Sequence, residues 1–352
     1  MMESLLKEWD GETVIVRHDR PTEAWIYIAI HSSRLGPATG GTRMKHYDSQ
    51  EAALDDALRL ACGMTYKFAV PGLERGGGKA VISIPENLDP DARPDLLRRY
   101  GGLVHQLGGI FYTGPDVGTC TEDMDIIAET GAPYVFACSP EAGGAGSTGP
   151  LTALGVFTGI QVACETVLRD ESLAGCKVLV QGAGSVGGIL IEHLRDAGAE
   201  VMFSDISEEI IQQYRDEVGL QFIPGDEVYA ADCDIFAPCA LGGILNEATI
   251  PQLKCRFIAG GANNQLAYPE DAERLRARGI AYAPDYVVSV GGAMGITGME
   301  LQGWSQEEAQ ERVTASVRHA LRRIFEIAEV QQITTDEAAR QIAHEHLAQG
   351  LD

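Results

Sequence analysis

Hydrophobic and polar positions in the first part of the chain follow two different spacings. Short apolar runs at 25–30 (WIYIAI) and 78–84 (GKAVISI) predict buried strands. In the segment 48–69, apolar residues recur at every third or fourth position, which predicts a helix capped by Asp48 or Ser49. Strands and helices are therefore mixed here, as in an α/β domain.

A glycine-rich stretch separates this part from a second one with a more regular pattern. The segment 121–131 predicts a short helix closed by Gly131, and 139–149 (SPEAGGAGSTG) favours a linker. Short apolar strands then alternate with segments that can form helices, which is typical of a parallel, doubly wound sheet. These strands are expected at 177–181, 200–205, 233–238, 256–261 and 279–284, and the segment 305–347 is expected to be largely helical.

The turn after the first of these strands has the pattern G-x-G-x-x-G, formed by Gly182, Gly184 and Gly187. Gly182 allows a tight turn, Gly184 lets a pyrophosphate approach the backbone, and Gly187 allows close packing of the next helix. The second strand ends at Asp205, which is placed to bind a ribose 2′-hydroxyl and favours NAD over NADP. A purely structural turn is the alternative, but the strand and helix around the glycines favour a Rossmann-type domain that binds NAD.

Charge, hydropathy and cysteine spacing exclude several classes of protein. The 51 acidic against 27 basic residues give a net charge of −24, which argues against a nucleic-acid partner. No apolar run approaches the roughly 20 residues of a membrane helix, and the start lacks an export signal. We therefore expect a cytoplasmic protein with no membrane partner. The eight cysteines form no C-x-x-C pair, and His344 and His346 face different directions on a helix, so no metal site is expected.

Lys79 follows three glycines and therefore raises the question of a phosphate loop. The nucleotide-triphosphate motif needs glycine at 73 and serine or threonine at 80, but the chain has Leu73 and Ala80. The glycines also lead into a predicted strand, whereas a phosphate loop leads into a helix. The phosphate-loop interpretation is therefore disfavoured.

Lys67 continues an apolar stripe on the helix 48–69, so it either extends to solvent or is buried for a purpose. A lysine between apolar walls and beside a second cation loses proton affinity and becomes a usable base. Two lysines, Lys67 and Lys79, would also attract a small carboxylate. Asp116 follows a predicted strand, and either it points into a cleft or it bonds its own turn.

At these residues the chain resembles the glutamate/leucine/phenylalanine/valine dehydrogenase family, in its leucine and phenylalanine dehydrogenase branch. The blocks that match in order are LGPATGGTR (35–43), MTYK (64–67), GGGKAVI (76–82), TGPDVGT (113–119), DIFAPCALGGILN (234–246), IAGGANNQL (258–266) and APDYV (283–287). The resemblance covers nearly the whole chain. It implies reversible, NAD-linked oxidative deamination of a hydrophobic L-amino acid to a 2-oxo acid and ammonia.

The resemblance also implies roles for individual residues. Lys67 is similar to the lysine that binds the substrate carboxylate, Lys79 to the low-pKa lysine that activates water, and Asp116 to the acid/base aspartate. The implied substrate-pocket residues are Gly40, Gly41, Met64 and Asn264, and Asn264 also contacts the nicotinamide region. The implied cofactor-site residues are Gly182, Gly184, Ser185, Val186, Gly187, Asp205, Thr152, Cys239 and Ala240.

Departures from the family pattern bear on substrate choice. Ser289 and Val290 stand where the family usually has Asn-Ala, and Thr39 replaces an apolar residue. Gly114 agrees with phenylalanine dehydrogenases and makes space for a larger side chain. One methylene is worth only about 1–3 kcal/mol, so this glycine does not assign the substrate.

The expected organisation is a substrate-binding and oligomerisation domain at 1–145, an NAD-binding domain at 146–327, and a segment 328–352 that returns to the first domain. The family usually forms homo-oligomers. The alternative function is a catalytically silent NAD-binding metabolite sensor on the same scaffold. Retention of Lys67, Lys79, Asp116 and Asn264 together favours the enzyme.

Overall fold

The structure, a computed structural model, describes residues 2–169 and 172–350. Inter-residue contacts divide the chain into two units. Unit 1 comprises Met1–Ser147, Ile296–Ser305 and Ala343–Asp352, and unit 2 comprises Thr148–Gly295 and Gln306–Ile342. The inclusion of Ile296–Ser305 in unit 1 was not anticipated from the sequence, because one continuous helix, α10 (Val290–Gln302), carries the chain from unit 2 into unit 1.

Unit 1 is built on a five-stranded sheet with the order β1-β2-β4-β3-β5. Its strands are β1 (Thr13–Asp19), β2 (Ala24–Ser32), β3 (Ala38–Lys45), β4 (Gly76–Ser83) and β5 (Phe111–Pro115). The pairs β1–β2 and β2–β4 are antiparallel, whereas β3 runs parallel to both β4 and β5. The strands predicted at 25–30 and 78–84 are confirmed as β2 and β4.

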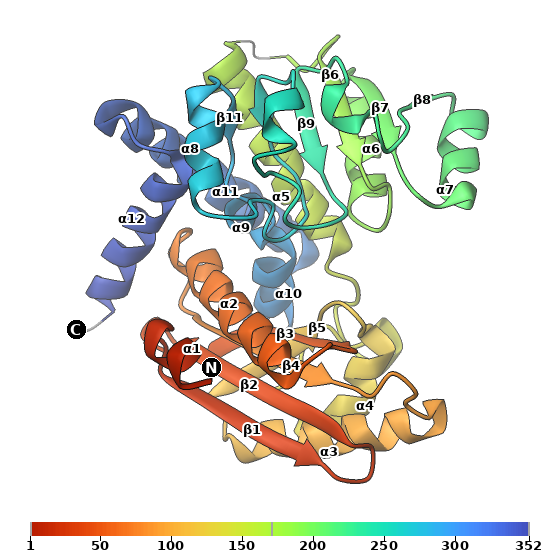
Figure 1. The fold of residues 1–352 in the computed structure, drawn as a ribbon, viewed down its shortest axis with the longest axis vertical. Helices are drawn as coiled ribbons and strands as arrows, with labels where there is room; N and C mark the ends of the chain where they lie inside the picture. Colours follow the sequence, from red (N-terminus) through yellow and green to blue (C-terminus); the bar gives the residue numbers. More distant parts are fainter. Residues whose placement is uncertain (1, 170–171, 351–352) are drawn as a thin grey trace. The chain divides into compact units, whose positions relative to one another are not determined.

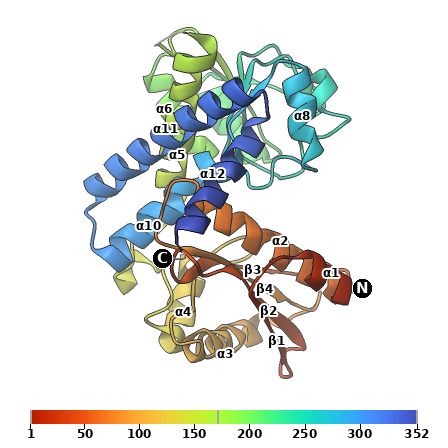
Figure 2. The ribbon, with the colours of Figure 1, turned by 90° about the vertical axis from the view of Figure 1, so that its left-hand side faces the viewer.

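Helices cover both faces of this sheet (Figures 1 and 2). The helix α2 (Gln50–Ala69) packs on one face through a cluster that includes Leu54, Leu58 and Val81. The helices α3 (Arg93–Gln106) and α4 (Thr121–Gly131) pack on the other face, where Leu97, Met124 and other apolar residues meet the even-numbered positions of β4. Each face thus has its own apolar core.

The predicted N-cap of α2 is confirmed at Ser49, whose hydroxyl accepts a hydrogen bond from the backbone N–H of Ala52. The prediction that the helix 121–131 ends at Gly131 is confirmed, but glycine is not needed there for its backbone conformation. Gly131 is the last residue of α4 and does not have a positive φ. Its missing side chain instead permits close packing of α4 on α3, because an added Cβ would lie 3.1 Å from the Cα of Gly101.

Unit 2 contains a six-stranded, wholly parallel sheet with the order β11-β10-β9-β6-β7-β8. Its strands are β6 (Lys177–Gln181), β7 (Glu200–Ser204), β8 (Gln221–Phe222), β9 (Ile235–Pro238), β10 (Phe257–Ile258) and β11 (Ala281–Tyr282). The order reverses direction at β6, so two strand–helix halves diverge from this strand. This confirms the predicted α/β class with a Rossmann-type, doubly wound sheet.

The helices of unit 2 flank this sheet (Figure 1). They are α5 (Gly149–Ala163), α6 (Gly187–Asp196), α7 (Glu208–Gln212), α8 (Glu270–Ala277), α9 (Asp285–Val288), α11 (Gln306–Gln331) and most of α12 (Thr335–Gln349). The expectation that no apolar run approaches the length of a membrane helix is wrong, because the segment Gly149–Leu168 is long and apolar enough to cross a membrane by length and composition. However, 56% of its most apolar window is buried, and α5 packs against α11 and α6. A core helix of a domain passes the same test, so this segment is weak evidence for a membrane span.

The end of α12 belongs to unit 1 and contacts the end of α2. His346 shares a hydrogen bond of 2.6 Å between its Nδ1 and the backbone oxygen of Ala69. His344 meets the ring of Tyr66 edge-on, with a centroid separation of 5.9 Å. His344 and His346 therefore hold the end of α12 against α2. Among the described residues, no cluster of three or more metal-ligating side chains occurs.

Candidate active site

Lys79 and Asp116 form a buried ion pair on the α2-facing side of the unit 1 sheet. Lys79 lies in the middle of β4, and Asp116 directly follows β5. The Nζ of Lys79 is 3.2 Å from Oδ1 of Asp116, and the two side chains are only 6% and 12% exposed. The structure therefore brings together two predicted site residues that are 37 positions apart in sequence.

Arg43, at the end of β3, holds the other oxygen of Asp116. Its Nε donates a hydrogen bond of 2.8 Å to Oδ2 of Asp116, and its Nη1 lies 3.0 Å from Oδ2 of Asp56 on α2. Tyr47 donates a hydrogen bond of 2.6 Å to the same oxygen of Asp56. The alternative that the Asp116 side chain bonds its own turn is therefore wrong. Its carboxylate binds the two cations Lys79 and Arg43, and its backbone N–H donates to the hydroxyl of Thr119 instead.

The pKa values in this cluster follow from burial and charge. Burial lowers the pKa of Lys79 below its ordinary value, although the charge of Asp116 opposes that shift. Burial by itself would raise the pKa of Asp116, but the charges of Lys79 and Arg43 outweigh it and hold this pKa at about 2. Asp116 is therefore ionised, and Lys79 gives up its proton more readily than a solvated lysine.

The three glycines before Lys79 serve close packing. An added Cβ at Gly77 would collide with the backbone of Thr65 on α2, and one at Gly76 would collide with the carbonyl oxygen of Ser32. An added Cβ at Gly78 would lie 3.0 Å from the ring of Phe111. These contacts explain the three glycines without any bound phosphate. This agrees with the departure of the sequence from the nucleotide-triphosphate motif at Leu73 and Ala80.

Three of the predicted substrate-pocket residues, Gly40, Gly41 and Met64, lie near the same ion pair, whereas Asn264 belongs to unit 2. An added Cβ at Gly40 would collide with the carbonyl oxygen of Gly78 and lie 3.3 Å from Cγ of Met64. One at Gly41 would lie 3.0 Å from Cβ of Asp116. Lys67 is half-buried in the last turn of α2, one helical turn beyond Met64.

Gly114 does not open a space as the sequence indicated. An added Cβ there would collide with the ring of Phe136, which is 4% exposed and belongs to an apolar cluster with Tyr112, Ile296 and Met299. Phe136 therefore fills the volume that the missing side chain of Gly114 leaves. The sequence argument for a larger substrate at this position is not supported.

In unit 2, the turn between β6 and α6 has the geometry of a dinucleotide cradle. Gly182 has a φ of +89°, and an added Cβ at Gly187 would collide with the carbonyl oxygen of Gly182. At Gly184 an added Cβ would meet nothing within 4 Å. The backbone of Gly184 is therefore open to a ligand, whereas Gly187 is closed by packing. Ser185 and Val186 then lead into α6, whose first free N–H groups favour an anion.

Asp205 lies beside this turn, directly after β7. Its Oδ2 accepts a hydrogen bond of 2.8 Å from the N–H of Ala183, and its Oδ1 accepts one of 2.9 Å from Ser207. These bonds fix the carboxylate next to the glycine turn. Such a carboxylate can accept a hydrogen bond from a ribose hydroxyl of a dinucleotide.

Two further cofactor-site candidates, Cys239 and Ala240, directly follow the carboxyl end of β9 (Ile235–Pro238). Ala240 lies against the glycine turn, since a Cβ added at Gly182 would be 2.8 Å from the Cβ of Ala240. Cys239 precedes it, and its Sγ accepts a hydrogen bond of 3.4 Å from Gly261. Burial raises the pKa of this thiol to about 11, so it is uncharged. Asn264 donates its backbone N–H to Asp285 at 2.8 Å and has a φ of +53°.

Thr152 and Ser289 mark the region where α5 meets the start of α10. The hydroxyl of Thr152 donates to the backbone oxygen of Thr148 at 2.9 Å, and an added Cβ at Gly292 would collide with it. Ser289 is 3% exposed, and its Oγ has no hydrogen-bond partner within the part of the chain that the structure describes. A buried hydroxyl without a partner is uncommon, and here it stands at a position where the chain departs from the pattern of the family that it resembles.

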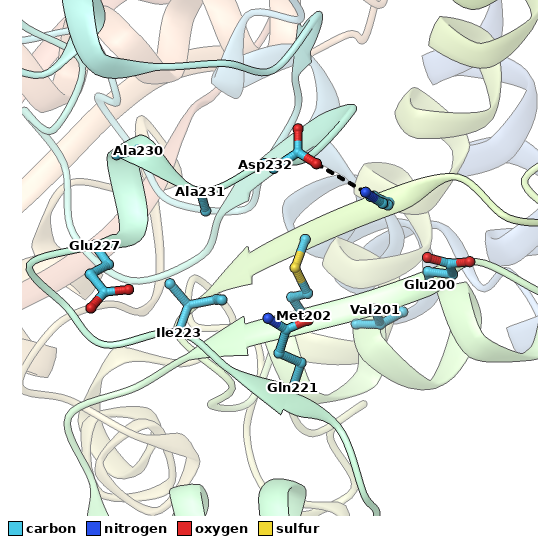
Figure 3. A pocket seen from close by; sticks show the side chains of 10 residues that line it. Glu200, Val201, Met202, Gln221, Ile223, Glu227, Ala230, Ala231 and Asp232 are labelled. Atoms are coloured by element: carbon cyan, nitrogen blue, oxygen red, sulfur yellow. Dashed lines mark hydrogen bonds and ion pairs between the residues drawn. The ribbon is translucent and has the colours of Figure 1, made fainter.

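One pocket of about 460 Å³ lies at the opposite end of the unit 2 sheet (Figure 3). Its lining includes Lys177 and Glu200, the first residues of β6 and β7, and the ion pair between Lys177 and Asp232 at 3.0 Å. Ligands of doubly wound sheets bind at the carboxyl ends of the strands. This pocket is therefore not the cofactor site.

Sequence reasoning missed the residues behind the ion pair. Arg43 and Asp56 were not singled out, and neither was Phe136. Arg43 lies in the block LGPATGGTR, and Asp56 lies on α2 within the helical segment that the sequence indicated. An arginine near the end of a strand and an aspartate on an amphipathic helix are the only signals in the sequence, and each is common on its own. That Asp56 is only 9% exposed is seen in the structure alone.

Comparisons with known proteins agree with this geometry. Residues 16–132 match the family model described as "Glu/Leu/Phe/Val dehydrogenase, dimerisation domain", and residues 204–351 match "Glutamate/Leucine/Phenylalanine/Valine dehydrogenase". A leucine dehydrogenase of Geobacillus stearothermophilus is 42% identical over 97% of this chain and 92% of its own length. An L-tryptophan dehydrogenase of Nostoc punctiforme is also 42% identical, over 97% of this chain and 95% of its own.

A solved structure gives the same result in three dimensions. The crystal structure of L-tryptophan dehydrogenase from Nostoc punctiforme has a TM-score of 0.82 and 40% sequence identity to this chain. The match covers 99% of both chains.

Proposed function

This chain belongs to the glutamate/leucine/phenylalanine/valine dehydrogenase family, and we propose that it oxidises a hydrophobic L-amino acid to the 2-oxo acid and ammonia with NAD. The observation that carries this proposal is the buried pair of Lys79 and Asp116 in a chain that also has an open glycine turn for a dinucleotide. Full-length relatives that act on leucine and on tryptophan support a branched-chain or aromatic substrate.

Unit 1 supplies the groups that handle the substrate. We assign Lys67 to the α-carboxylate, because it is a half-buried cation one turn from Met64 on the helix beside the ion pair. Asp116 is ionised and can take a proton from the substrate amino group. Lys79 has a lowered pKa, so its neutral form can remove a proton from the water that attacks the imino carbon.

Unit 2 supplies the cofactor site. When bound, oxidised NAD would accept the hydride from the substrate Cα. The backbone at Gly184 would hold the pyrophosphate, and Asp205 would accept a hydrogen bond from the ribose. The open side of Gly184 and the fixed carboxylate of Asp205 fit this group. Replacing Asp205 with asparagine removes the negative charge, so the preference for NAD over NADP in kcat/KM should fall by about 10-fold or more.

The experiment that tests the proposal is a panel of L-amino acids with the purified protein and NAD. Turnover appears as the absorbance of the reduced nicotinamide, and ammonia is measured in parallel. We expect activity with at least one of leucine, valine, phenylalanine and tryptophan. If NAD binds but no substrate in the panel is oxidised, the proposed activity is rejected for these substrates, and the alternative of a catalytically silent metabolite sensor on the same scaffold is favoured.

We also expect a homo-oligomer. The strand β1 lies at the edge of the unit 1 sheet, where Val16 is 46% exposed. The family model that matches this unit is described as a dimerisation domain. Light scattering of the purified chain measures the number of subunits.

A further inference from the structure

Arg43 links two buried aspartates through different nitrogens of one planar group. Its Nε binds Asp116 at 2.8 Å, and its Nη1 binds both oxygens of Asp56, at 3.3 and 3.0 Å. The arginine side chain is 14% exposed and both aspartate side chains are 12% exposed. Because a guanidinium is rigid and planar, fixing it at Asp56 also fixes where it meets Asp116.

Asp116 uses its two oxygens for two different cations. Oδ2 accepts from Arg43, and Oδ1 faces the Nζ of Lys79 at 3.2 Å. Without Arg43 the carboxylate could rotate and offer either oxygen to Lys79. The arginine therefore decides which oxygen of Asp116 is left for the reacting side of the site.

Asp56 is itself held from two further directions. Tyr47 donates to its Oδ2 at 2.6 Å, and Arg59 lies 3.7 Å from its Oδ1. Asp56 is on α2, while Tyr47 follows β3, so the contact also ties the helix to the sheet. The series Tyr47–Asp56–Arg43–Asp116–Lys79 is thus continuous, with a hydrogen bond or an ion pair at every step.

We propose that Arg43, anchored by Asp56 and Tyr47, is a positioning residue of this reaction that orients Asp116 toward Lys79. The inference rests on the proposed function, because it assigns Arg43 a role through Lys79 and Asp116. Arg43 does not need to touch substrate or cofactor in this role.

The charges around Lys79 give the role a signature that a structural ion pair lacks. The positive charge of Arg43 disfavours a proton on Lys79, whereas the negative charges of Asp116 and Asp56 favour it. Removing the charge of Arg43 should therefore raise the pKa of Lys79, and removing that of Asp56 should lower it. Lys79 lies on the α2-facing side of the sheet, so the groups that bear on its charge come from α2 and from the strands β2, β3 and β5. Their titratable or charged residues are Tyr27 and His31 on β2, Arg43 and Lys45 on β3, Glu51, Asp55, Asp56, Arg59, Cys62, Tyr66 and Lys67 on α2, and Tyr112 on β5 with Asp116 after it.

Unit 1 offers a matched control. Arg99 binds Asp19 through two nitrogens, at 2.7 and 2.8 Å, and the Asp19 side chain is 2% exposed. This pair resembles the Arg43 contact in type and in its buried carboxylate, although the Arg99 side chain is 31% exposed against 14% for Arg43. No hydrogen bond or ion pair joins it to Lys79 among the described residues. The variant Arg99→Gln therefore reports the loss of a buried ion pair alone.

The experiment compares Arg43→Gln, Arg43→Lys, Asp56→Asn, Tyr47→Phe and Arg99→Gln in the full chain. The pH profile of kcat/KM is measured for each, and the Lys79 side-chain resonance is titrated by NMR with isotope-labelled lysine, assigned with Lys79→Met. We expect Arg43→Gln to lower kcat about 10- to 100-fold, with the KM for NAD unchanged. In Arg43→Gln, the acidic limb of the kcat/KM profile and the titration of Lys79 should both move to higher pH. In Asp56→Asn, both should move to lower pH.

The conservative variants separate charge from geometry. Arg43→Lys keeps the positive charge. The pKa of Lys79 in this variant should therefore be closer to its value in the parent chain than the pKa of Lys79 in Arg43→Gln is, and kcat should be higher than in Arg43→Gln. Tyr47→Phe should cause a smaller loss of kcat than Asp56→Asn. Arg99→Gln should leave both the pH profile and the Lys79 titration unchanged, even if it lowers the thermal midpoint.

The proposal is overturned if Arg43→Gln and Asp56→Asn shift Lys79 in the same direction or not at all. It is also overturned if Arg99→Gln lowers kcat as much as Arg43→Gln at equal loss of stability. The NMR titration needs no turnover. A parent chain that oxidises no amino acid would therefore reject the proposed function, while the titration would still decide whether Arg43 and Asp56 act on Lys79.

Discussion

The ammonium nitrogen of Lys79 lies 3.2 Å from Oδ1 of Asp116, with both side chains almost wholly inside unit 1. Such a pair is costly to bury unless further groups satisfy it. Here Arg43 satisfies the second carboxylate oxygen, and the charges of the four groups Lys79, Arg43, Asp116 and Asp56 sum to zero when all are ionised. This balance allows a proton to be moved within an apolar surrounding.

Replacing Lys79 with alanine should abolish turnover while NAD binding persists. General acid–base groups contribute about 100- to 10,000-fold to rate, so kcat should fall by at least that range. Binding of NAD, measured by fluorescence titration, should be unchanged because Lys79 belongs to unit 1 and the glycine turn to unit 2. Lys177→Ala, which removes a half-exposed lysine, is the control. Near-normal oxidation by the Lys79 variant would contradict the mechanism.

The pH dependence of kcat/KM should have an acidic limb from Lys79. Its folded-state pKa is below the ordinary value, so the base form exists nearer to neutral pH, and activity is lost as pH falls through this pKa. Asp116, with a pKa of about 2, stays ionised over the same range and adds no limb in the free enzyme. Steady-state rates across pH give the limb. Its persistence in an active variant that lacks Lys79 would assign it to another group.

Replacing Gly114 with alanine should lower the free energy of unfolding by about 1–3 kcal/mol, because the new methyl group collides with the ring of Phe136. Urea unfolding measures this change. Gly102→Ala is the control, since an added Cβ there meets nothing within 4 Å and alanine favours the helix α3 by about 0.5–1 kcal/mol. The double variant with Phe136→Ala should recover part of the loss if the collision is the cause.

Two glycines of the turn after β6 should respond differently to alanine. Gly184→Ala should leave the free energy of unfolding within about 1 kcal/mol of the parent, because its Cβ points into open space, but should weaken NAD binding. Gly187→Ala should lower the free energy of unfolding, because its Cβ collides with the carbonyl oxygen of Gly182. Calorimetry of unfolding and of NAD binding separates the two effects. Equal behaviour of both variants would contradict this division of roles.

Much of the fold followed from the sequence because the signals were local. The helix 48–69 was marked by apolar spacing and by Ser49, and the structure has it at Gln50–Ala69. The strand before the glycine turn was marked by KVLVQ, and the structure has β6 over the same residues. The turn signal at Gly131 was interpreted incorrectly, because the helix packing that requires a glycine there involves Gly101, which is distant in sequence.

The candidate site was only partly predictable. Lys79 and Asp116 could be chosen from their motifs, but their contact depends on the order of β4, β3 and β5 in the sheet. Gly114 was interpreted as making space because the sequence does not show that Phe136 fills it.

By itself, the sequence determined the α/β class, the glycine turn of unit 2 and the family, since each depends on residues that are adjacent or regularly spaced. Only the tertiary structure decided that Arg43 and Asp56 support Asp116, and that 296–305 belongs to unit 1. The physical reason is that a buried charge is stabilised by whichever opposite charge lies within a few ångströms in space, and strand order, which is not local, decides which one that is.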